Sequence, residues 1–109
     1  MKLRITPDLV RFRLEDGEVE RLLRDRHLVQ RLSVSREHPF EYGIVIDDSR
    51  NSCSLESGGD RSSGLVVVLP GTMIDGLMNE PDESIRLEAT SDTDPINIVI
   101  EADQACRHG

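Results

Sequence analysis

The apolar residues of this chain recur at an almost constant offset between its two halves, and this recurrence restricts its fold more than any other feature. Leu14 matches Leu69 at an offset of 55, and the match continues through four successive elements to 44–47 and 98–101, at an offset of 54. A shared offset across four elements is not expected by chance. The sequence therefore predicts two tandem strand-strand-helix-strand-strand repeats related by a pseudo-twofold axis.

Alternating polar and apolar residues at 2–5 and 10–14 flank Thr6-Pro7-Asp8, a pattern typical of a β-hairpin. The expected inward side chains are Leu3, Ile5, Val10, Phe12 and Leu14. A helix is predicted over 16–26, because Val19, Leu22 and Leu23 share one helical face, acidic residues come first and arginines last. The other predicted strands are 28–35, 40–47, 52–56, 65–69, 86–90 and 98–101, with a second helix over 72–79.

These elements predict an α+β fold with two helices and mostly antiparallel strands, closed as a barrel-like structure or stacked as a two-sheet sandwich. A length of 109 residues indicates a single domain, 1–109, with repeats 1–48 and 52–103 and a polar linker at about 48–63. Burial in a domain of this size explains the fold without a cofactor, a structural metal or disulfides.

Charge is distributed unevenly along the chain. Residues 1–54 hold ten Lys or Arg and ten Asp or Glu, whereas 55–109 hold three and eleven, so the net charge of −8 comes from the second half. This balance argues against nucleic acid as a partner. Since no long apolar stretch is present, we expect neither a signal peptide nor a membrane span, and predict a cytoplasmic protein.

The first hairpin supplies the clearest candidate binding site. Lys2, Arg4, Arg11 and Arg13 alternate with the apolar residues and therefore share the opposite face, where they could hold a phosphate or an acidic strip of a partner. The simpler interpretation is a solvated face whose charges pair with nearby carboxylates. The matching positions of the second repeat are Val66 and Val68, which indicates either a strand covered on both faces or an interface between subunits.

No pattern for catalysis or metal binding is present. His27, His38 and His108 are scattered without ligand spacing, and neither Cys53 nor Cys106 lies in a recognised nucleophile or CxxC signature. Reduced thiols are expected, although a single bridge between these cysteines stays open. Carboxylates such as Asp47 and Glu101 follow strands, as is typical of solvated turns, and no cation-binding motif contains them.

Three segments together resemble a known family: Met1-Lys2-Leu3-Arg4, then Val10-Arg11-Phe12-Arg13-Leu14 followed by Glu18-Val19, and Ile98-Val99-Ile100-Glu101 with Ala105-Cys106. The chain is similar to a family of small, uncharacterised bacterial proteins described as a domain of unknown function. This resemblance implies a bacterial cytosolic setting and transfers no catalytic residue. We therefore predict a non-enzymatic binding or interaction module, with a homo-oligomer or another protein as partner. The alternative is a binder of small anions, or an enzyme, that uses a cleft between the repeats.

Overall fold

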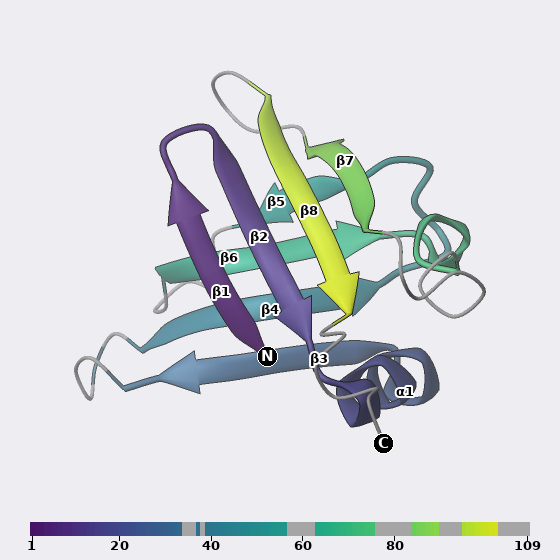
Figure 1. The fold of residues 1–109 in the computed structure, drawn as a ribbon, viewed down its shortest axis with the longest axis horizontal. Helices are drawn as coiled ribbons and strands as arrows, with labels where there is room; N and C mark the ends of the chain where they lie inside the picture. The colour runs from purple at the N-terminus through teal and green to yellow at the C-terminus, as the bar shows by residue number, and fades with distance from the viewer. Residues whose placement is uncertain (34–36, 38, 57–62, 76–83, 90–94, 103–109) are drawn as a thin grey trace.

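The computed structural model describes residues 1–33, 37, 39–56, 63–75, 84–89 and 95–102. Within these ranges, eight strands, one α-helix and one short 3-10 helix follow one another (Figure 1). In order they are β1 (Lys2–Thr6), β2 (Leu9–Leu14), α1 (Asp16–Asp25), β3 (His27–Leu32), β4 (Phe40–Ile46), β5 (Ser54–Glu56), β6 (Ser63–Leu69), η1 (Gly71–Met73), β7 (Ile85–Ala89) and β8 (Ile96–Ala102).

The strands form two four-stranded mixed sheets. Sheet A has the order β1-β2-β8-β7, and sheet B has the order β3-β4-β6-β5. The central pair of each sheet, β2 with β8 and β4 with β6, is parallel, and the outer pairs are antiparallel. Figure 1 shows the strands of the two sheets crossing at a steep angle, with β1 and β7 at the edges of sheet A.

The predicted first hairpin and first helix are confirmed. β1 and β2 pair across a turn at Pro7 and Asp8, and α1 covers 16–25. Glu18 caps the helix, because its Oε1 accepts a hydrogen bond from the backbone N–H of Glu15 at 3.0 Å. The helix ends at Arg26, whose φ of 68° is left-handed and whose N–H donates to the carbonyl of Leu22 at 2.8 Å.

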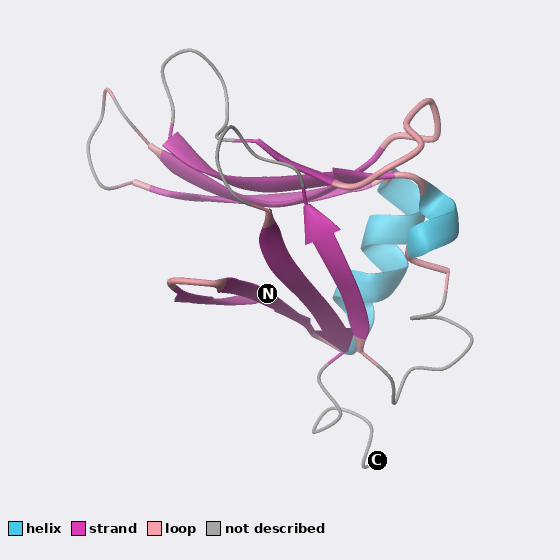
Figure 2. Cartoon of the chain, turned by 90° about the horizontal axis from the view of Figure 1, so that it is seen from above, coloured by secondary structure: helices cyan, strands magenta, loops and turns pink. Residues whose placement is uncertain are grey.

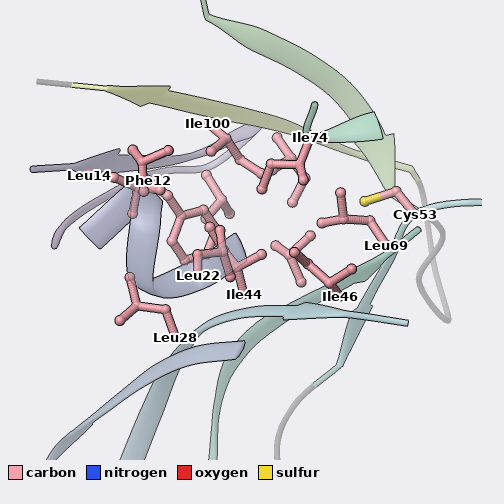
Figure 3. Close-up of a cluster of buried hydrophobic side chains, with 14 of the residues drawn as sticks. Phe12, Leu14, Leu22, Leu28, Ile44, Ile46, Cys53, Leu69, Ile74 and Ile100 are labelled. Atoms are coloured by element: carbon pink, nitrogen blue, oxygen red, sulfur yellow. The ribbon is translucent and has the colours of Figure 1, made fainter. Parts of the chain in front are cut away.

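The core lies between the two sheets, and α1 stands at one side of it (Figure 2). Alternate residues of the central strands point inward, so Phe12, Ile44, Leu69 and Ile100 are fully buried and face one another (Figure 3). Leu22 on α1 joins this cluster. Of the predicted inward residues of the first hairpin, Val10, Phe12 and Leu14 are buried, Leu3 is half-buried, and Ile5 is 54% exposed.

The predicted fold class is wrong. The described part of the chain is mostly sheet, contains a single α-helix, and shows two separate mixed sheets with no closed barrel. The predicted strand-strand-helix repeats are not shown as separate units, since each sheet takes two strands from each half of the chain. The alternating pattern shows which face of a strand is buried and does not show which strand lies beside it.

The second predicted helix, over 72–79, is also wrong where it can be checked. Its beginning is the 3-10 helix η1, in which Met73 N–H bonds to the carbonyl of Pro70 at 3.1 Å and Ile74 N–H bonds to Gly71 at 3.0 Å. Glycine at the start of this segment favours helix poorly, and Ile74 after η1 is buried in the core. Residues 76–79 of the prediction lie outside the described residues.

Within the described ranges, no helix has the length and apolar character required to cross a membrane.

Candidate anion-binding face

The first hairpin brings four cationic side chains together on the face of sheet A that is turned away from the core. In the register of β1 and β2, Lys2 lies opposite Arg13, and Arg4 lies opposite Arg11. Both pairs alternate with the pairs that contain the buried residues Phe12 and Val10, so their side chains share the outer face. We call Lys2, Arg4, Arg11 and Arg13 the basic face. Directly opposed like charges destabilise a hairpin, which makes this arrangement costly without an anionic neighbour.

One carboxylate, that of Glu101, is an anionic neighbour of part of the basic face. Glu101 on β8 lies opposite Arg13, and its Oε1 accepts a hydrogen bond from Arg13 Nε at 3.1 Å. The same oxygen is 3.8 Å from Arg11 Nε, which is an ion-pair distance and too long for a hydrogen bond. Among the described residues, neither Lys2 nor Arg4 takes part in an ion pair. Within the described residues, Glu101 therefore pairs with only two of the four cations.

The basic face surrounds a hollow of about 330 Å³, lined by its four cationic residues and Leu3. Arg11 has a polar atom without a partner: its Nε is buried and finds no hydrogen-bond acceptor among the described residues. Its neighbour in the register is Val99, which is only 4% exposed although it points outward. The stems of Arg11 and Arg86, which flank Val99 in the register, explain this burial.

The rest of the same outer face is balanced in charge. A second hollow, of about 530 Å³, lies over β7 and β8 and is lined by Asp8, Arg86 and Glu88 among others. The Asn97 amide at its side donates a hydrogen bond to the carbonyl of Asp8 at 3.4 Å. The excess of positive charge on sheet A is thus concentrated over β1 and β2.

The two valines predicted at a subunit interface lie on the outer face of sheet B. Val68 is 5% exposed and Val66 is half-buried, so the chain itself already covers the first of them. Both belong to β6, and Val66 lies beside Gly43 of β4 in the register. An interface at Val66 stays a prediction.

The carboxylates, histidines and cysteines considered as candidates in the sequence do not form a common site within the described residues. Asp47 accepts hydrogen bonds from the hydroxyl and backbone N–H of Ser49, which hold the pKa of Asp47 below its usual value, while Glu101 belongs to the basic face. His27 Nδ1 lies 2.9 Å from the carbonyl of Asp25. In the described ranges, no group of three or more His, Cys, Asp or Glu could hold a metal ion. His38, His108 and Cys106 lie outside those ranges.

Cys53 is a free thiol in the core, 4% exposed (Figure 3). Burial raises its pKa from 9.0 to about 11. Because the thiolate is the reactive form, this environment makes Cys53 a poor nucleophile.

One polar cluster was not predicted from the sequence. Asp48 follows β4; its Oδ2 pairs with the guanidinium of Arg26, and its Oδ1 accepts a hydrogen bond from the N–H of Gly71 at 2.8 Å. A hollow of about 550 Å³ lies beside this cluster, with Arg50 and Asp75 in its lining. The cations here are already paired, since Arg50 contacts Asp47 and Glu56. The local feature of this cluster is the left-handed backbone of Arg26, which ends α1. The sequence did not reveal it, because an arginine rarely adopts that conformation.

Fold and site together define a small protein of two mixed sheets that presents a compact basic face on an otherwise acidic chain. Comparison with known protein families identifies its family. The chain belongs to a family of unknown function (DUF7009), whose model matches residues 1–109. The predicted resemblance to an uncharacterised family is thereby confirmed. No curated protein and no solved structure matches the chain.

Proposed function

We propose that this protein is a binding module that uses the basic face of sheet A to hold a ligand carrying clustered negative charge. One observation supports this most directly. Two pairs of like charges stand directly opposite each other around a hollow, and among the described residues only Arg11 and Arg13 pair with a carboxylate, that of Glu101. An anion seated there would relieve the repulsion between the opposed side chains and accept hydrogen bonds from their donors.

The geometry also explains how the site would discriminate between ligands. Guanidinium groups present donors in a planar fork that matches carboxylate and phosphate oxygens, and three of the four cations are arginines. Arg13 is oriented by its hydrogen bond to Glu101, and Arg11 lies at ion-pair distance from the same oxygen, so part of the site is already organised before a ligand arrives. Lys2 and Arg4 are exposed and free of ion pairs with described residues, so they are the groups that would gain most from an anion.

Isothermal titration calorimetry tests the proposal with two probes of different origin, inorganic tripolyphosphate and a hexaglutamate peptide. Binding of either probe is expected, with an affinity that falls as NaCl rises from about 50 to about 200 mM. The double variant Lys2→Gln with Arg4→Gln should weaken binding by about tenfold or more, which corresponds to about 1.4 kcal/mol.

The matched control removes two positive charges elsewhere. Arg21→Gln with Arg24→Gln changes two exposed residues of α1 and lowers the net charge by the same amount. This variant should bind both probes like the wild type. Equal losses of affinity in the two double variants would mean that only net charge matters. If neither probe bound the wild type, the proposed function would be refuted.

A further inference from the structure

The basic face ends at an open strand edge. β1 is the outermost strand of sheet A, and in the described part of the chain nothing pairs with the side that faces away from β2 (Figure 1). We infer that the ligand of the basic face is an extended peptide segment of alternating acidic and apolar residues, which adds to sheet A as a new antiparallel strand beside β1. This inference rests on the proposed function and specifies its ligand.

The backbone of β1 has the donors and acceptors that such a strand requires. A two-residue turn closes the hairpin at the pair Thr6 and Leu9, which exchange hydrogen bonds in a hairpin of this length. Hydrogen-bonded pairs alternate along an antiparallel strand, so Lys2 and Arg4 direct their backbone groups toward β2. Leu3 and Ile5 direct theirs toward the open edge.

The side chains of β1 specify what the added strand would carry. Lys2 and Arg4 extend from the outer face, so acidic side chains suit the positions beside them. On the opposite face Leu3 is half-buried and Ile5 is 54% exposed, although they lie opposite the core residues Phe12 and Val10. Apolar side chains on the added strand would cover Ile5 and extend the core side of the sheet. Strand addition of this kind takes affinity from the backbone and specificity from alternate side chains.

The register places a glutamate of the ligand closest to Arg4. Since Arg4 bonds toward β2, it forms a non-hydrogen-bonded pair with the added strand, and such pairs bring Cα atoms to about 4.5 Å. The valine positions of the ligand then lie opposite Leu3 and Ile5, where they exchange backbone hydrogen bonds. Three other described strands lie at sheet edges, and each suits this ligand less. β7 carries Glu88 on its outer face, β5 has three residues, and the one arginine of β3, Arg31, already pairs with Glu41.

Fluorescence anisotropy tests the inference with a labelled, capped peptide of alternating Glu and Val. We expect saturable binding to the wild type. Methylation of the valine nitrogens removes the donors that face β1 and keeps every charged side chain, so it should weaken binding by about tenfold or more. A peptide in which Lys replaces Glu should bind the wild type poorly, because its charge has the same sign as the basic face.

A pair of variants at one position tests the edge from the side of the protein. Ile5→Pro removes an N–H at the open edge without removing a bond to β2, and Ile5→Val keeps that N–H. The first should lose the peptide and still bind tripolyphosphate, whereas the second should bind both. Equal affinity for the methylated and unmethylated peptides would overturn strand addition, even if Ile5→Pro failed to fold. If the wild type bound neither tripolyphosphate nor hexaglutamate, the proposed function itself would be refuted.

Discussion

Gly43 and Gly17 show how differently two glycines of one chain can respond to the same added methyl group. A Cβ built on Gly43, in β4, would overlap the backbone of β3 at Leu28 and Val29. Backbone atoms within a sheet cannot move aside as a flexible side chain can. We predict that Gly43→Ala lowers the free energy of unfolding by about 2 kcal/mol or more, measured by urea denaturation.

The matched variant Gly17→Ala should have the opposite sign. Gly17 is exposed on the first turn of α1, and a Cβ there meets no atom within 4 Å. Alanine favours helix and restricts the unfolded chain, so a gain of about 0.5 kcal/mol is expected. If Gly43→Ala were as stable as Gly17→Ala, the close approach of β3 and β4 would be wrong.

The buried thiol of Cys53 should make the stability of the protein depend on pH. Its pKa is raised to about 11 in the folded protein, from 9.0 for an unperturbed thiol, because burial disfavours the thiolate. Between these values the folded state binds more protons than the unfolded state, so stability should fall as pH rises from about 9 to about 11. Below that range Cys53 should make no pH-dependent contribution.

Denaturation curves across this pH range measure the effect by difference. The variant Cys53→Ala removes the thiol, so the fall with pH should be shallower than in the wild type, although the variant is less stable throughout. In a Cys106→Ser background, Cys53 should also resist a thiol reagent until the protein is unfolded. Rapid labelling of the native protein would contradict its burial.

At the scale of elements, Asp48 connects three segments that are distant in sequence. It follows β4, pairs with Arg26 after α1, and accepts the N–H of Gly71 at the start of η1. Asp48→Ala should lower the free energy of unfolding by about 1–2 kcal/mol, since it removes an acceptor as well as a charge. Asp48→Asn keeps an acceptor for Gly71 and should cost about 0–1 kcal/mol, as exposed ion pairs contribute little.

Thermal or urea denaturation of the two variants separates these contributions. A larger loss in Asp48→Ala than in Asp48→Asn assigns the effect to the hydrogen bond with Gly71. Equal losses would assign it to the ion pair with Arg26 and would contradict the expectation for exposed charges.

The elements that sequence predicted well are those fixed by local patterns. The hairpin of β1 and β2 follows from alternation around a Pro-Asp turn, and α1 follows from apolar spacing with acidic residues at its start. The prediction of a second helix was wrong over the described residues, although its apolar spacing matches that of α1. Gly71 stands at its start, where α1 has the capping residues Glu15 and Glu18. Matching apolar spacing therefore did not ensure matching local stability.

The candidate site was predictable only in part for the same reason. Alternation alone places Lys2, Arg4, Arg11 and Arg13 on one face, and the structure shows them around one hollow. The partner carboxylate could not be predicted, because Glu101 comes from a strand 88 positions after Arg13 and reaches it through the parallel pairing of β2 with β8. Hydrophobic periodicity carries no information about that pairing.

At the scale of the whole molecule, the two halves of the chain complete each other's sheets. β1 and β2 form sheet A with β7 and β8, and β3 and β4 form sheet B with β5 and β6. Both parallel central pairs therefore join a strand of the first half to a strand of the second. A hairpin alone is marginally stable in water, so neither half contains a sheet that can persist without the other.

This shared construction predicts how the protein responds to division between the halves. Fragments 1–51 and 52–109, produced separately, should each lack cooperative unfolding and show little strand signal in circular dichroism. Mixed in equal amounts, they should recover the strand signal and a cooperative transition, because the parallel pairs can form only between fragments. A mixture of 1–51 with a 52–109 fragment carrying Ile98→Asp, which places a charge in the core, should not recover. Stable folding of either fragment alone would contradict a single shared core and would favour two autonomous repeats.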